Sequence, residues 1–230
     1  MSIYVLPPAA PATLAVAGTP ARFPVNRVFC IGRNYAWSPG EPRPTALPAW
    51  FMKPASAVVP AEGPLPYPPE TAEFCHEIEL VAAIGLGGRN IDPGQAERHV
   101  FGYAAGLDLT RRDLQQQAKC AGGPWEPAKA FDHSAPCTPL VPAAAIGHPR
   151  QGVVWLAVNG TQRQRAGIAD LLWPVPALVA MLSRSVALQP GDLVFTGTPA
   201  GVGPLQVGDR ITGGVTGIGD FSMTVTSEPT

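Results

Sequence analysis

Carboxylates alternate with apolar residues along the segment 74–85, which begins polar and ends apolar. This alternation predicts a β-strand. Residues two apart in a strand point to the same face, so Glu77 and Glu79 should project together while Ile78 faces the opposite layer. Two neighbouring carboxylates repel each other unless one is protonated, both are solvated, or a cation lies between them.

A third carboxylate follows in the next strand-like run. Residues 101–108 predict a second strand, and Asp108 lies at its end, just before a charged, amphipathic segment. The pair Glu77 and Glu79 alone fits a solvated edge strand better than a metal site. With Asp108 added, hard divalent cations become the better explanation, since three carboxylates leave about half of an octahedral shell open to water or a chelating substrate.

The rest of the pattern predicts short strands joined by turns, with few helices. Asn159 and Gly160 form a strong hairpin signal after the apolar run 153–158. Further strands are expected at 27–32, 57–60 and 188–195, and two more within 207–225. Residues 60–69 are expected to form a proline-rich turn region. Helical segments are expected at 93–100, 109–118 and 168–185. The proline-rich segment 37–50 predicts a loop that can fold over a pocket as a lid.

The composition narrows the class of protein. The chain has 230 residues, 14% charged residues, 25 glycines and 28 prolines, which predicts one mainly β domain at 25–230 with a short N-terminal preamble at 1–24 packed on it. A hydrophobic content of 46% without a long apolar run indicates surface buried between identical subunits rather than in a membrane.

Charge and cysteine spacing exclude other classes. A net charge of −1 without a basic cluster argues against a nucleic-acid partner. The N-terminal residues lack the pattern of a secretory signal, so we expect a cytoplasmic protein. The cysteines are far apart in the sequence, without the paired spacing of a zinc site, and are expected to be reduced thiols; they are Cys30, Cys75, Cys120 and Cys137.

Several ordered motifs resemble the fumarylacetoacetate hydrolase family, in its short bacterial branch, over roughly residues 27–225. In chain order they are Gly32-Arg33-Asn34-Tyr35-Ala36, Phe51-Met52-Lys53-Pro54, His76-Glu77-Ile78-Glu79-Leu80, Asp108 to Gln115, Lys129-Ala130-Phe131-Asp132, Asn159-Gly160, Pro190-Gly191-Asp192, and Thr196 to Gly203. The segment 110–136 looks most like that of fumarylpyruvate and related acylpyruvate hydrolases.

The resemblance implies a mixed α/β, mostly β fold: a rolled sheet like an incomplete barrel with a few short helices, usually as a homodimer. It implies that Glu77, Glu79 and Asp108 bind a metal, Mg²⁺ as a rule, with Mn²⁺ or Ca²⁺ as alternatives. It places further residues in the substrate pocket, with Lys129 near the keto oxygens of a keto acid; these are Arg33, Tyr35, Lys53, Gln115, Lys129 and Thr198.

The implied reaction is hydrolysis of the carbon–carbon bond of a 2,4-diketo acid through a metal-stabilised enolate, in the catabolism of aromatic compounds. Hydrolytic members of the family place a His, and three residues later a Glu, after the Asn-Tyr-Ala segment. Here these positions are Ser38 and Glu41, so Glu41, or an imidazole supplied elsewhere such as His76 or His133, would have to serve as the catalytic base. The missing His leaves open a decarboxylase or keto–enol isomerase of a 2-oxo acid such as oxaloacetate, or a weakly active relative that binds metal and ligand.

Overall fold

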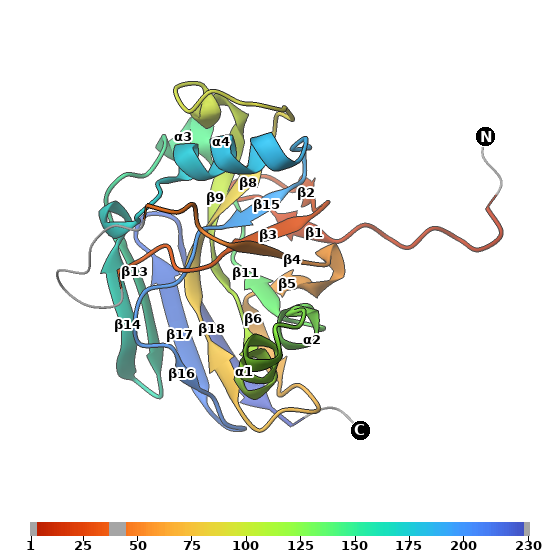
Figure 1. Ribbon diagram of the computed structural model, residues 1–230, viewed down its shortest axis with the longest axis vertical. Helices are drawn as coiled ribbons and strands as arrows, with labels where there is room; N and C mark the ends of the chain where they lie inside the picture. Colours follow the sequence, from red (N-terminus) through yellow and green to blue (C-terminus); the bar gives the residue numbers. More distant parts are fainter. Residues whose placement is uncertain (1–3, 37–44, 228–230) are drawn as a thin grey trace.

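The computed structural model describes residues 4–36 and 45–227, and it is mostly β-structure with short helices (Figure 1). The strands are β1 (Thr13–Ala15), β2 (Arg22–Pro24), β3 (Val28–Ile31), β4 (Trp50–Lys53), β5 (Val58–Pro60), β6 (Glu62–Pro66), β7 (Phe74–His76), β8 (Ile78–Ile84), β9 (Val100–Leu107), β10 (Thr110–Arg111), β11 (Ala135–Cys137), β12 (Val141–Pro142), β13 (Val153–Val158), β14 (Thr161–Gly167), β15 (Leu193–Phe195), β16 (Gly203–Pro204), β17 (Arg210–Val215) and β18 (Gly219–Thr226). The α-helices are α1 (Arg112–Ala121), α2 (Glu126–Lys129), α3 (Ala143–Ile146) and α4 (Val175–Ser185), and the 3₁₀ turns are η1 (Ala55–Ala57), η2 (Ala96–His99) and η3 (Ile168–Asp170).

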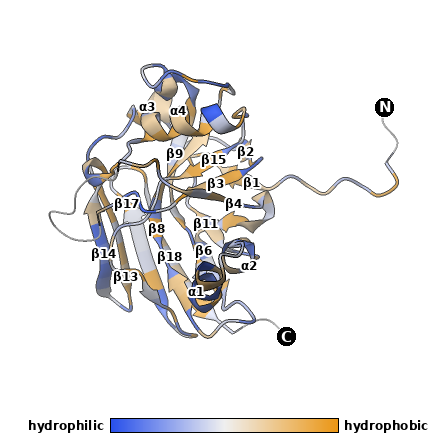
Figure 2. Cartoon of the chain, viewed as in Figure 1, coloured by the Kyte–Doolittle hydropathy of each residue, from blue (hydrophilic) through white to orange (hydrophobic). Residues whose placement is uncertain are grey.

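The fold is a strongly curled sheet of the half-barrel type. One sheet has the strand order β4-β3-β15-β8-β9-β11-β5, and a second has the order β14-β13-β17-β18-β6. Strand β8 is buried along its whole length at the centre of the first sheet. Figure 2 shows apolar residues on the central strands and polar ones on the outer strand β14. The mostly β fold predicted from the sequence is therefore confirmed.

The two faces of β8 have different neighbours. Ile78, Leu80 and Ala82 belong to the apolar core that includes residues of the second sheet, such as Leu156 and Ile211. Val81 and Ala83 pack into a separate apolar cluster on the other face. The predicted alternation therefore holds, and it leaves the side chains of Glu77 and Glu79 on the face away from the second sheet.

Most predicted elements are present, with shifted boundaries. The Asn159-Gly160 turn joins β13 to β14, and both residues have positive φ, 51° and 78°, as a type I′ hairpin turn requires. Helix α4 begins only at Val175, because Pro174 and Pro176 favour the first turn of a helix over its interior; the start of the predicted helix forms the separate turn η3 at Ile168–Asp170.

The proline-rich segment 60–69 is not only a turn region as predicted. It contains β6, which pairs in parallel with β18 through residues that include Pro64 and Pro66. Proline lacks an N–H donor but is tolerated there, because β6 is an edge strand of its sheet.

The Pro190-Gly191-Asp192 motif fixes β15 beside β3. Asp192 is fully buried, and its carboxylate accepts hydrogen bonds from Arg27 Nη2 (2.6 Å), Arg27 Nε (3.0 Å) and Asn26 Nδ2 (3.0 Å). Gly191 has a φ of 95°, and a Cβ there would lie 2.7 Å from the main-chain oxygen of Pro24. Because β15 leads directly into residues 196–199, this anchor also sets the position of that loop.

Candidate metal centre

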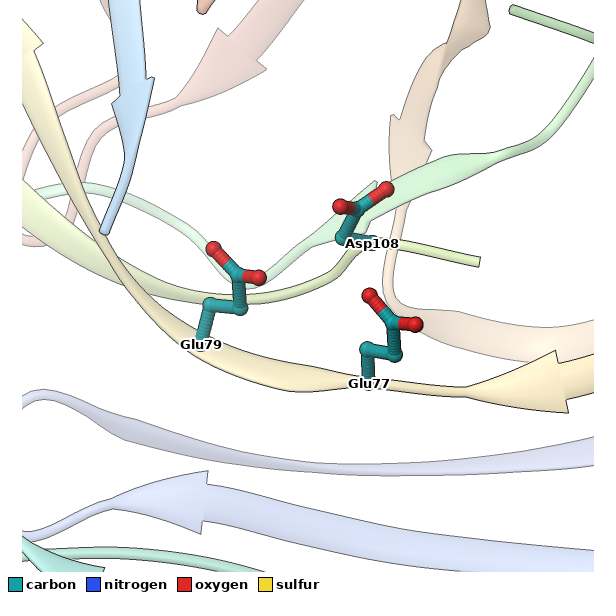
Figure 3. Close-up of side chains that lie close together, drawn as sticks. All are labelled: Glu77, Glu79 and Asp108. Carbon is teal, nitrogen blue, oxygen red and sulfur yellow. The ribbon is translucent and has the colours of Figure 1, made fainter. Parts of the chain in front are cut away.

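The three predicted carboxylates come together in one buried cluster. Glu77 lies between β7 and β8, Glu79 lies within β8, and Asp108 follows the last residue of β9. One oxygen atom from each lies within 4.8 Å of the others, and the side chains point toward a common space (Figure 3). Their residues are 7%, 1% and 2% exposed, respectively, so the alternative of a solvated acidic edge strand is excluded.

Two buried lysines neutralise part of this cluster. Lys129 Nζ donates hydrogen bonds to Glu77 Oε2 (2.8 Å) and Asp108 Oδ2 (2.9 Å). Lys53 Nζ lies 3.0 Å from Asp108 Oδ1, an ionic contact without hydrogen-bond geometry. Lys53 instead donates to the main-chain oxygen atoms of Leu109 (3.1 Å) and Lys129. The lysines therefore hold Asp108 and each other in place.

Helix α1 adds a third cation on the Glu77 side. Arg112 donates one hydrogen bond to Glu77 Oε1 and another to Gln115 Oε1 (2.5 Å). Gln115 lies one turn further along α1 and is 4% exposed. Arg112 was expected only as part of a family motif, without a role of its own. Its contacts now place both it and Gln115 beside the carboxylate of Glu77.

The electrostatics show where positive charge is still needed. Burial alone would raise the pKa of Asp108, but the adjacent Lys129 and Lys53 outweigh it and hold that pKa below its usual range. Burial, followed by repulsion from Asp108, raises the pKa of Glu79 well above that of an ordinary carboxyl group. Glu79 accepts a hydrogen bond from Gly197 N (2.7 Å) but forms no ion pair with any described residue.

These observations fit a divalent cation. The donor set consists of oxygen atoms only, which suits hard cations such as Mg²⁺ and Mn²⁺. A cation placed among the three carboxylates would supply the charge that Glu79 lacks. The side chains brought together are the three carboxylates that the sequence analysis singled out.

Thr198 and Gln164 link the cluster to the second sheet. The Thr198 hydroxyl donates to the main-chain oxygen of Ile78 (2.8 Å) and accepts from Gln164 Nε2 (2.8 Å). Gln164 Oε1 accepts from His76 Nδ1 (2.9 Å) and from the main-chain N of Ile78 (3.2 Å). Gln164 was not predicted, because nothing in the sequence of the hairpin distinguishes it from Gln162.

The remaining expected pocket residues lie in or near residues 33–41. Tyr35 is buried, and its hydroxyl has no hydrogen-bond partner in the described part of the chain. Burial, followed by the nearby charges of Glu79 and Asp170, raises the pKa of Tyr35, so its hydroxyl stays protonated. Arg33 is exposed and has a φ of 55°. Ser38 and Glu41 lie outside the described residues.

The curled half-barrel and the buried carboxylate cluster are consistent with the family that comparison with known proteins identifies. Residues 27–226 match the model of the fumarylacetoacetate (FAA) hydrolase C-terminal family. The chain therefore belongs to the fumarylacetoacetate hydrolase family, as its motifs predicted.

Fumarylpyruvate hydrolases and an oxaloacetate tautomerase are both among the proteins to which the chain is similar. The chain is similar to the crystal structure of fumarylpyruvate hydrolase from Pseudomonas aeruginosa in complex with Mn²⁺ and pyruvate, with 49% identity, a TM-score of 0.95, and coverage of 98% of this chain and 100% of that one. It is 42% identical to a fumarylpyruvate hydrolase from a Ralstonia species, over 76% of this chain and 91% of that protein. It is also 42% identical to the oxaloacetate tautomerase YcgM of Escherichia coli, over 83% of this chain and 88% of that protein.

The four free cysteines form no disulfide. None of the helices in the described ranges is long and apolar enough to cross a membrane.

Proposed function

We propose that the protein hydrolyses the carbon–carbon bond of a 2,4-diketo acid of the fumarylpyruvate or acylpyruvate type, in the catabolism of aromatic compounds. The observation that carries the proposal is the buried cluster of Glu77, Glu79 and Asp108 with Lys129 hydrogen-bonded to two of its members. The likeness to fumarylpyruvate hydrolases supports it.

In this reaction, water adds to the C4 carbonyl carbon and the C3–C4 bond then breaks. The bonding electron pair passes to the pyruvyl fragment as an enolate, which takes up a proton at C3. The products are pyruvate and the carboxylic acid of the acyl group. Forming the enolate is the costly step, so groups that stabilise its negative charge accelerate the reaction.

The chain supplies cations and hydrogen-bond donors for that charge. Glu77, Glu79 and Asp108 would hold Mg²⁺, with Mn²⁺ or Ca²⁺ as alternatives, and the bound cation supplies Lewis acidity toward the carboxylate and 2-oxo oxygen atoms of the substrate. Lys129 provides a positive charge next to the same site. Burial lowers the pKa of Lys129, but Asp108 and Glu77 reverse this and raise it above its usual range, so its ammonium group stays charged.

Further residues would orient the substrate, and one would activate water. We assign substrate contacts to Arg33, Tyr35, Lys53, Gln115 and Thr198. Glu41 would take the proton of the attacking water, because Ser38 stands where hydrolytic relatives carry a His. A keto-acid substrate and a homodimeric assembly complete the proposal.

A second candidate is keto–enol isomerisation of a 2-oxo acid such as oxaloacetate. It needs the same enolate stabilisation but no attacking water, so Ser38 would not impair it. The likeness to the E. coli oxaloacetate tautomerase favours it. Decarboxylation of such an acid would also proceed through an enolate, and would release CO₂. A protein that only binds metal and keto acid would give none of these products.

The test incubates the purified protein with Mg²⁺ or Mn²⁺ and, separately, fumarylpyruvate, acetylpyruvate and oxaloacetate. Hydrolysis releases pyruvate plus the cognate acid, decarboxylation releases CO₂, and isomerisation changes only the enol absorbance. Glu77→Ala is the control that should abolish every metal-dependent signal. The proposal fails if neither diketo acid yields pyruvate while oxaloacetate is isomerised or decarboxylated.

A further inference from the structure

The three lysines of the chain all lie around the metal centre. Lys53, Lys119 and Lys129 are the only lysines in the sequence; every other basic side chain, apart from the histidines, is an arginine. Lys53 and Lys129 are buried and contact Asp108. Lys119 is exposed, in the last turn of α1. It contacts none of the three carboxylates, so it needs a different explanation.

Lys119 is held in place by neutral groups. Its Nζ donates to Gln115 Oε1 (3.3 Å), one helical turn earlier, and lies 5.3 Å from the centroid of the Trp125 ring. Within the described residues Lys119 forms no ion pair. The amide and the aromatic face therefore orient an ammonium group that no carboxylate of the described residues contacts directly.

Contacts place this ammonium group on the Glu77 side of the centre. Gln115 Oε1 accepts from both Lys119 and Arg112, and Arg112 also binds Glu77. Partial burial and repulsion from Arg112 and Arg33 lower the pKa of Lys119. A cation placed among other cations is unfavourable unless an anion joins them.

We infer that Lys119 binds a second carboxylate of the substrate, at the far end of its acyl group. The inference rests on the proposed function: the pyruvyl end of the substrate would lie at the metal centre, and the acyl group would extend along α1 past Gln115. The substrate class is then a 2,4-diketo acid with a terminal carboxylate, rather than one with an uncharged acyl group. Lys119 is a specificity-determining residue in this scheme.

A purely structural role for Lys119 gives a different expectation. A cation in the last turn of a helix interacts favourably with the helix dipole, and its loss would lower stability slightly. Such a loss would affect every substrate equally. The two roles are therefore separated by comparing two substrates that differ in the distal carboxylate.

The first experiment measures kcat and KM of Lys119→Met with fumarylpyruvate and with acetylpyruvate, which lacks the distal carboxylate. KM for fumarylpyruvate should rise about tenfold or more, because a charge-assisted hydrogen bond is lost, while both constants for acetylpyruvate stay within about twofold. Lys119→Arg should restore most of the difference. Arg184→Met, which removes an exposed positive charge in α4, should change kcat and KM for neither substrate. Equal effects on both substrates, or none, would overturn the inference.

A second experiment needs no turnover. An amine-acetylating reagent should modify exposed Lys119 but not the buried Lys53 and Lys129, and peptide mass spectrometry measures each site. Fumarate in the presence of Mg²⁺ should protect Lys119 relative to the N-terminal amine, whereas acrylate, with one carboxylate, should not. Equal protection by fumarate and acrylate, or no protection by either, contradicts the inference. Absence of pyruvate release from wild-type protein would refute the proposed reaction instead, and protection would still report the carboxylate site.

Discussion

Lys53 donates a hydrogen bond to the main-chain oxygen of Lys129, so one buried ammonium group fixes the chain position of the other. The same ammonium group also bonds the main-chain oxygen of Leu109, next to Asp108. It also lies 3.0 Å from Asp108 Oδ1, so it contacts both Asp108 and the chain at Lys129. This geometry supports a role in holding Asp108 and Lys129 together.

Replacing Lys53 should destabilise the protein strongly. Lys53→Met leaves the buried main-chain oxygen of Leu109 without its donor and removes one counter-charge of the buried Asp108; the main-chain oxygen of Lys129 keeps its hydrogen bond from Ser134 Oγ. We expect a loss of about 3 kcal/mol in the free energy of unfolding, measured by urea denaturation without metal. The control is Glu97→Gln, which breaks an exposed ion pair with Arg150 and should cost less than about 1 kcal/mol. Equal losses for the two variants would contradict this account.

The pH dependence of the stability of the metal-free protein should reveal the raised pKa of Glu79. Its pKa is raised in the folded state, mainly by burial. The sign follows from proton linkage: Glu79 contributes stability below its unfolded pKa, and this contribution is lost as pH rises through the folded value. Asp108 has a lowered pKa and does the opposite, contributing stability above its unfolded pKa that is lost as pH falls through the folded value.

Glu79→Gln should therefore stabilise the metal-free protein at neutral pH, by removing a charge that is costly to bury. Unfolding by urea in the presence of a chelator, between about pH 5 and 8, measures the difference from wild type. The difference should shrink toward the acidic end of this range. A variant less stable than wild type at neutral pH would show that Glu79 has a counter-charge without metal.

With metal bound, the wild-type protein should be more stable than Glu79→Gln, the reverse of the order expected without metal. A ligand at 100 times its Kd stabilises the folded state by about 2.7 kcal/mol, and Mg²⁺ or Mn²⁺ should raise the Tm of the wild-type protein accordingly. Glu79→Gln should lose most of this shift, since it lacks one carboxylate ligand. Glu97→Gln, outside the cluster, should keep it. Calorimetric titration with Mn²⁺ gives the affinities directly.

Ser38→His tests whether only a base is missing for efficient hydrolysis. If so, the variant should release pyruvate from an acylpyruvate about a hundredfold faster than wild type, the usual range for a positioned general base. Isomerisation of oxaloacetate, which needs no attacking water, should change little. A hydrolysis rate no higher than that of the wild-type protein would count against this explanation.

Gln164 should matter although it lies in the second sheet. Gln164→Leu removes four hydrogen bonds, including those to His76, Ile78 and Thr198, and leaves buried polar groups unpaired. We expect a loss of about 2 kcal/mol in the free energy of unfolding and a lower kcat. Gln162→Leu, at an exposed position of the same strand, is the matched control. Similar effects from both variants would refute the conclusion that the hydrogen bonds of Gln164 support the site.

Local patterns predicted the features that depend on neighbouring residues. Alternation placed Glu77 and Glu79 on one face, Asp108 was expected at a strand end, and the turn at Asn159 was expected from its dipeptide. The prolines of β6 hid that strand, because its place at a sheet edge depends on pairing with β18. The partners of Lys53 and the role of Gln164 could not be predicted, because they depend on contacts between segments distant in sequence.

The anchoring of β15 between β3 and β8 has a consequence for synthesis of the chain. Glu79 receives its hydrogen bond from Gly197, and Thr198 bonds Ile78 across more than half the sequence. Such distant pairings form late in folding, because long loops must close first. A nascent chain that has emerged from the ribosome only through α4 would therefore lack the closing edge of the metal centre, and the cation would be captured only near the end of translation.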